Sequence, residues 1–183
     1  MSAHAVHSLG TLTTVPALEN LDLVGAPVAT LLRTWEHADE VGVVAIDPDH
    51  ADTAGTVEVY GVPWDAGANC VVIAGRREGE ERIAACVVRG DTKADVNNRV
   101  KRLLDVRKCS FLDHERAVTG TGMEYGGITP IGVPSDWRLL VDARVPATEL
   151  VLIGSGIRGS KIILPGRLLG ALPGAEVVEG LAV

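Results

Sequence analysis

Cysteine is scarce in this chain and does not form the patterns that bind metal or build disulfide frameworks. The 183 residues include three cysteines, Cys70, Cys86 and Cys109, an odd number, and no CxxC or HxxxH spacing is present. A structural or catalytic zinc site is therefore not expected. Cys70 and Cys86 lie in apolar, strand-like runs, where cysteine behaves as a small hydrophobic residue. These features predict a reduced, cytoplasmic protein without a disulfide framework, metal or other cofactor.

Long apolar runs, a secretion signal and a recognisable nucleophile motif are also lacking. No stretch of 18 or more apolar residues occurs, so no membrane-spanning helix is expected. The first residues lack the basic region and apolar core of a secretory signal, and no G-x-S-x-G segment is present. Residues 154–159, Gly-Ser-Gly-Ile-Arg-Gly, satisfy GxGxxG. However, a strand-like segment, residues 161–164, follows where a dinucleotide site requires a helix.

Basic residues are nearly missing from the first third of the chain. Residues 1–60 contain one, Arg33, against nine acidic residues, whereas residues 61–183 contain sixteen basic and fifteen acidic residues. The net charge of −7 argues against strong non-specific binding to nucleic acid, DNA included, because attraction to phosphate drives such binding. Residues 89–108 nevertheless hold seven basic residues and three acidic ones. This segment is either a solvated helix face or a local contact with the end of a nucleic acid.

The apolar pattern predicts an α+β fold with a mixed, mostly antiparallel central sheet and surrounding helices. At this length we expect one domain over residues 16–183, preceded by a loose tail over residues 1–15. Strands are expected at residues 41–46, 69–75, 83–89, 137–142, 150–154, 161–164 and near 176–178. Helices are expected within residues 17–36, at 94–106 and 113–118, and after Pro165. Residues 52–60 suit a helix or a strand equally well by composition.

Residues 121–134, Thr-Gly-Met-Glu-Tyr-Gly-Gly-Ile-Thr-Pro-Ile-Gly-Val-Pro, form the most informative segment. Its glycines surround Pro130, and little in it could fill a core. Glycine has no Cβ and tolerates positive φ, so such a loop allows backbone groups to approach a ligand closely. The alternative is a structural turn between two strands.

This TG…GG-x-(S/T)-P-x-G pattern resembles the substrate loop of the YbaK/EbsC family of aminoacyl-tRNA deacylases, which includes the editing insertion of bacterial prolyl-tRNA synthetases. Further segments resemble the family's strands, "GD" turn, following helix, "vD" strand, glycine hairpin and closing helix, in that order. They are residues 68–74, 81–91, 94–104, 137–142, 151–159 and 164–169. The resemblance spans roughly residues 45–180 and implies a helix at residues 52–60.

The resemblance implies a stand-alone, trans-editing deacylase that hydrolyses the ester of a mischarged tRNA. One methylene discriminates by only ~1–3 kcal/mol, so synthetases that confuse small amino acids need a second sieve. The ester is activated, and the protein mainly has to hold the 3′ adenosine and place donors against the carbonyl oxygen. The implied partners are the aminoacylated 3′ end of tRNA and, in addition, a synthetase.

One departure from the family concerns a lysine that begins the first central strand and contacts the substrate. This chain has Asn69 at the corresponding position, and an amide cannot supply a cation. This difference has three alternative explanations: the chain acts on a different substrate, another cation takes the place of the lysine, or the activity is lost. Lys161 and Arg158 lie on the hairpin that the family brings near the pocket, and they are either substitutes or ordinary solvent-facing charges.

The resemblance thus predicts a set of site residues. The expected catalytic residues are Asn69, Gly127, Thr129 and Lys161. The expected substrate-binding residues are Gly126, Ile128, Pro130, Asp142, Gly154, Gly156 and Arg158. Asp142 either orients a group in the pocket or caps the turn that follows it. One alternative function is a non-catalytic member that binds tRNA or a small ligand, and another is an interaction domain whose acidic N-terminal third docks a partner such as a synthetase.

Overall fold

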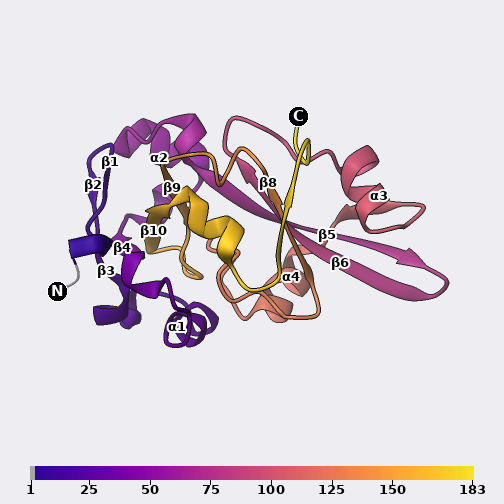
Figure 1. Ribbon diagram of the computed structural model, residues 1–183, viewed down its shortest axis with the longest axis horizontal. Helices are drawn as coiled ribbons and strands as arrows, with labels where there is room; N and C mark the ends of the chain where they lie inside the picture. Colours follow the sequence, from indigo (N-terminus) through magenta and orange to yellow (C-terminus); the bar gives the residue numbers. More distant parts are fainter. Residues whose placement is uncertain (1–2) are drawn as a thin grey trace.

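Two sheets form the framework of the computed structural model, which describes residues 3–183 (Figure 1). The smaller sheet is antiparallel throughout, in the order β3 (Val15–Pro16), β4 (Gly42–Ala45), β10 (Ser160–Pro165) and β9 (Leu150–Gly154). The larger sheet has the order β11 (Ala175–Val178), β8 (Arg138–Asp142), β6 (Glu80–Arg89), β5 (Ala68–Arg77) and β7 (Cys109–Phe111). In it, β8 pairs in parallel with β6 and β11, and the other pairs are antiparallel. The predicted α+β class with mostly antiparallel pairing is confirmed, although two sheets replace the single central sheet.

The long β5–β6 hairpin confirms the strand pair expected at residues 69–75 and 83–89. Asn69 pairs with Val88, and the pairing continues to the tip, where Glu78 and Gly79 connect the strands. Both tip residues have positive φ, 52° and 83°, which suits the twist of a two-residue hairpin turn. The hairpin projects away from the smaller sheet in Figure 1.

Side-chain caps and glycines set the ends of two helices. At α2 (Thr53–Tyr60), the Asp52 carboxylate accepts a hydrogen bond of 2.6 Å from the Gly55 N–H, and Gly61 ends the helix with φ 68°. Asp113 and Gly122 do the same for α4 (His114–Thr121). Both helices confirm the expectations for their segments.

Three other expected helices differ in kind or extent. Residues 94–106 contain a π-helix at Val96–Val100 and the short α3 (Lys101–Leu103) in place of one regular helix. The segment after Pro165 is a 3₁₀ helix, Gly166–Ala171. Within residues 17–36, two short 3₁₀ turns precede α1 (Ala26–Leu32), which begins beside Pro27, where proline fits the first turn. Further 3₁₀ turns lie at Ala3–Ala5, Ala38–Glu40, Pro48–His50 and Trp64–Ala66.

Successive side chains of each strand point to opposite faces of the sheet, and this alternation divides the core into layers. On β10, Ile162 and Leu164 join a core shared by α1 and both sheets, whereas Ile163 faces a separate cluster with Leu12 and Val62. On the far face of the larger sheet, a third cluster contains residues of β6, α3 and the C-terminal segment. The two sheets meet at β5 and β9, where Gly67 bridges to Leu152.

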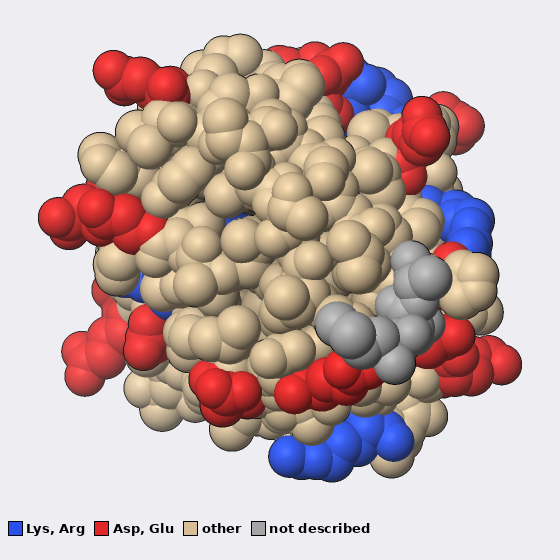
Figure 2. All heavy atoms as spheres, turned by 90° about the vertical axis from the view of Figure 1, so that its left-hand side faces the viewer, with Lys and Arg blue, Asp and Glu red and all other residues tan. Residues whose placement is uncertain are grey.

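The first residues are packed, which corrects the expectation of a loose tail over residues 1–15. Residues 1 and 2 lie outside the described part, but residues 3–15 include β1 (Ser8–Leu9), β2 (Leu12–Thr13) and the start of β3. Leu12 is buried, and the Thr14 hydroxyl donates to the Ala5 carbonyl at 2.8 Å. Figure 2 looks toward this side of the molecule and shows many acidic and few basic side chains.

Candidate functional site

A cleft of about 440 Å³ opens where β5, the β9–β10 hairpin and the start of α2 meet. Strand β7 pairs with residues 73–75 of β5, so residues 68–71 precede that pairing and contribute to the cleft wall. We call this hollow the site cleft. Its lining residues are Ala51, Asp52, Thr53, Ala68, Asn69, Cys70, Val71, Tyr125, Gly126, Ile128, Gly154, Arg158 and Lys161. Six residues expected from the sequence are thus brought together, namely Asn69, Gly126, Ile128, Gly154, Arg158 and Lys161.

Lys161 has an uncommon environment for a lysine. It pairs with Val44 and Gly154 within the smaller sheet, and only 8% of its surface is exposed. Burial, and then the charge of Arg158, lower the pKa of Lys161 to about 8, whereas Asp52 acts in the opposite direction. Among residues 3–183, the Lys161 ammonium has no hydrogen-bond or ion-pair partner. A buried charge without a partner is costly, so an anionic or carbonyl ligand in the cleft would relieve that cost.

Asn69 lies across the cleft at the start of β5. Its side-chain oxygen accepts a 2.9 Å hydrogen bond from the Thr53 hydroxyl, which links β5 to the first turn of α2. In the described part of the chain, the Asn69 NH₂ group donates to no protein acceptor. This group is therefore available as a neutral donor.

Arg158 and the loop around Gly126 form another wall. Gly126 has φ 83°, a conformation that favours glycine, and a Cβ there would lie 2.4 Å from Arg158 Nη1, so a side chain would displace the guanidinium from its place over the loop. Arg158 Nη2 donates to the Pro48 carbonyl at 2.9 Å, and the Arg158 N–H donates to the Glu124 carboxylate at 2.8 Å. Beside this wall, the half-exposed Tyr125 ring lies 4.4 Å from the His114 ring.

Gly127 is needed for close packing of the loop on the hairpin. A Cβ at Gly127 would lie 2.6 Å from the Ile157 backbone. The Gly127 carbonyl accepts a 2.7 Å hydrogen bond from the Gly156 N–H, and Gly127 does not line the site cleft. Gly156 is also outside the cleft lining and packs against Gly25.

Thr129 and Pro130 are likewise away from the cleft. Thr129 is fully buried, and within residues 3–183 its hydroxyl has no hydrogen-bond partner. Pro130 lines a different hollow beside Trp137 and Leu172. The loop therefore supplies the cleft through Tyr125, Gly126 and Ile128.

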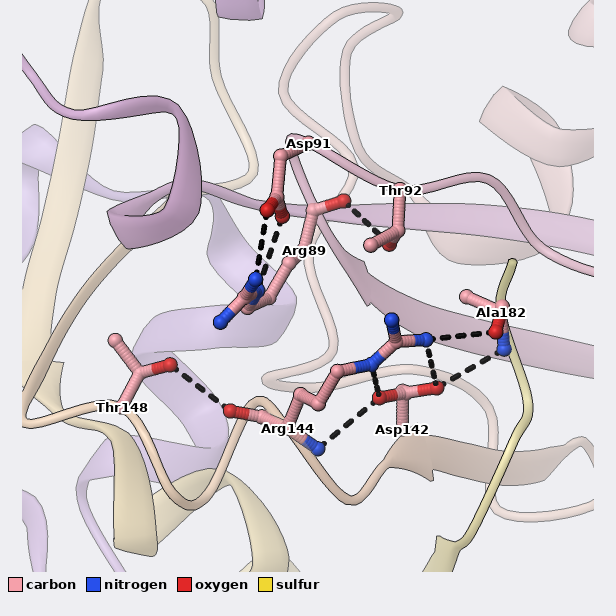
Figure 3. A network of polar contacts seen from close by, with 7 residues as sticks. All are labelled: Arg89, Asp91, Thr92, Asp142, Arg144, Thr148 and Ala182. Carbon is pink, nitrogen blue, oxygen red and sulfur yellow. Dashed lines mark hydrogen bonds and ion pairs between the residues drawn. The ribbon is translucent and has the colours of Figure 1, made fainter.

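Asp142 was expected at the site but belongs to a structural network at the end of β8 (Figure 3). It is 1% exposed, and its carboxylate accepts hydrogen bonds from the Arg144 guanidinium at 2.8 and 3.1 Å and from the Arg144 and Ala182 N–H groups at 3.0 and 2.9 Å. Burial alone would raise the pKa of Asp142, but these bonds outweigh it and leave the pKa below its ordinary value. The contacts cap the turn after β8 and fasten the C-terminal segment.

Sequence reasoning missed Asp52, Thr53 and Tyr125 among the cleft residues. Asp52 followed by a helical segment is a cap signal, but its nearness to Lys161 depends on the fold. Tyr125 lies inside the loop already singled out. Within residues 3–183, no three His, Cys, Asp or Glu side chains are grouped to hold a metal ion. No helix of this same part is long and apolar enough to span a membrane.

Comparisons with known proteins agree with this architecture. The profile of the family described as "Aminoacyl-tRNA editing domain" matches residues 47–171. One similar solved structure, described as a candidate trans-editing enzyme for prolyl tRNA synthetase, has 20% identity and a TM-score of 0.70, with 84% of this chain and 93% of the other covered. A scaffold protein from computational epitope-backbone grafting has 19% identity and a TM-score of 0.71, with 85% and 95% covered. The comparison with curated proteins gave no significant match.

Proposed function

The chain belongs to the aminoacyl-tRNA editing domain family, and from this premise we propose that it is a stand-alone deacylase that hydrolyses the ester of a mischarged tRNA. The observation that carries the proposal is the largely buried side chain of Lys161, whose ammonium has no protein partner among residues 3–183, in a cleft that also holds Asn69 and the Tyr125–Gly126 loop segment. A cation in this position replaces the charge that Asn69 lacks.

The chemistry requires little from the protein beyond positioning and charge stabilisation. Water adds to the ester carbonyl carbon, the bond to the ribose oxygen breaks, and the products are the free amino acid and the tRNA. Negative charge develops on the carbonyl oxygen, where a desolvated ammonium such as that of Lys161 stabilises it strongly. The Asn69 NH₂ group is placed to hold the substrate, and the exposed ring of Tyr125 offers a surface for the terminal base.

The test is a panel of mischarged tRNAs incubated with the purified protein and with Lys161→Gln. We expect hydrolysis of at least one member of the panel, and a ten- to hundredfold lower kcat/KM for the variant, since a hydrogen bond from a charged group is worth ~1.5–3 kcal/mol. Arg33→Gln, at an exposed cation outside the cleft, is the matched control and should behave as wild type.

Two outcomes would count against the proposal. Full activity of Lys161→Gln would show that Lys161 does not contribute to hydrolysis. If wild type hydrolyses no tRNA but binds one, and Asn69→Lys gains activity, the chain is a non-catalytic binding member of the family.

A further inference from the structure

A second groove lies next to the site cleft along β5, and the two hollows share part of their walls. It encloses about 680 Å³, within the size range of ligand sites, and shares Asn69 and Val71 with the site cleft. Its other lining residues are Val88, Thr92, Lys93, Ala94, Asp95, Val96, Asn97, Cys109, Ser110, Phe111 and Val183. A ligand that occupies the site cleft and extends past Asn69 therefore enters this second groove.

Phe111 gives the second groove an exposed aromatic surface. It is the single phenylalanine of the sequence, it ends the edge strand β7, and 63% of its surface is exposed. The core offers this side chain no burial, which leaves its ring free to stack on a flat ligand.

The charges around the second groove favour an anionic chain. Lys93 lines it. The exposed Arg107 and Lys108 directly precede β7 but line two other hollows, of which that of Lys108 also includes Phe111. Across residues 3–183, none of these three side chains has a hydrogen-bond or ion-pair partner. The one acidic side chain in the lining, Asp95, caps the π-helix, where it accepts hydrogen bonds from the Asn98 N–H and Nδ2 at 3.3 and 3.1 Å.

We infer that the second groove binds the unpaired nucleotides that precede the terminal adenosine of the tRNA. This inference rests on the proposed function, because an ester held in the site cleft places the terminal adenosine there. The cleft and the second groove share Asn69 and Val71, so a strand that leaves on this side reaches the second groove. Phe111 stacks on a base, and Lys93 contacts a phosphate. A positively charged groove with an aromatic platform is the general arrangement of single-stranded nucleic-acid sites.

The experiment compares two minimal esters that carry the same amino acid, an aminoacyl-adenosine and an aminoacylated CCA trinucleotide. We expect wild type to prefer the trinucleotide in kcat/KM. Phe111→Ala should lose about 5- to 100-fold on the trinucleotide and nothing on the adenosine ester. Phe111→Trp should keep the preference, and Trp64→Ala, at another exposed aromatic outside both grooves, is the matched control.

Equal effects of Phe111→Ala on the two esters, or none on either, would overturn the inference while leaving the proposed function intact. If wild type hydrolyses neither ester nor any mischarged tRNA, the proposed function fails. The groove is then tested by the affinity of a fluorescent, uncharged CCA trinucleotide. A weaker affinity for Phe111→Ala than for wild type and Trp64→Ala supports the groove, and equal affinities reject it.

Discussion

At the scale of single residues, Lys161 holds a positive charge in a largely buried position, where the charge is unfavourable unless a ligand binds. Its pKa of about 8 lies below the ordinary 10.5 because burial disfavours the ammonium. The resemblance pointed to Lys161 through its hairpin. Burial could not be predicted from that hairpin, since Val44 and Asp52, which lie near Lys161, come from separate segments.

Lys161→Met should stabilise the protein while impairing deacylation. Below pH 8 the lysine is charged in the folded and unfolded states, so wild type bears the full cost of burying the charge. Between pH 8 and 10.5 the folded protein loses the proton first, and wild type gains stability as the pH rises. The variant should therefore have a free energy of unfolding higher by up to about 3 kcal/mol at pH 7, and the difference should vanish near pH 10.5.

Urea denaturation across this pH range measures the effect. Arg33→Met, which removes an exposed cation, should stay within about 0.5 kcal/mol of wild type. If Lys161→Met is less stable than wild type at pH 7, the charge of Lys161 does not destabilise the folded protein.

At the scale of elements, the loop over residues 124–128 and the turn over residues 154–158 form one backbone-bonded unit. The Glu124 N–H donates to the Gly156 carbonyl at 2.9 Å, and the Gly156 N–H returns a bond of 2.7 Å to the Gly127 carbonyl. The glycine pattern indicated a close backbone approach at Gly127, and in the structure the hairpin makes such an approach, while that of a ligand stays a prediction. Composition indicates the space around a residue but cannot identify what fills it.

Gly127→Ala should destabilise this unit. Its Cβ would lie 2.6 Å from the Ile157 backbone, so the loop must shift, at a cost of about 1–3 kcal/mol, and deacylation should fall with it. Gly159→Ala is the matched control, because a Cβ there meets nothing within 4 Å. Chemical denaturation with parallel activity assays separates the variants, and equal stability of the two would contradict the packing role.

Asp142→Asn tests the network at the end of β8. The amide keeps the shape but loses the charge-assisted bonds from Arg144, so the free energy of unfolding should fall by about 1–3 kcal/mol at pH 7. Because the folded-state pKa of Asp142 is lowered, this contribution exists above its ordinary pKa and disappears as the pH falls through the folded value. Measured per folded molecule, kcat/KM of the variant should equal that of wild type. A loss of activity without a matching loss of folded protein would indicate that Asp142 acts in the functional site.

At the scale of the whole molecule, the sequence predicted the parts better than their assembly. The α+β class, the β5–β6 hairpin and helices α2 and α4 follow from local pattern and resemblance. The division into two sheets does not, because it depends on β4 pairing with β10, and these strands are far apart in the chain. Asp52 was missed for the same reason, because its nearness to Lys161 depends on the fold.

Strand β4 lies beside Lys161 but ends before residue 47, where the match to the family begins. The segment that matches the family and part of the support beside Lys161 thus lie in different stretches of the chain. Substitutions in β4 can alter the surroundings of Lys161, and with them its acidity, while every family motif stays unchanged.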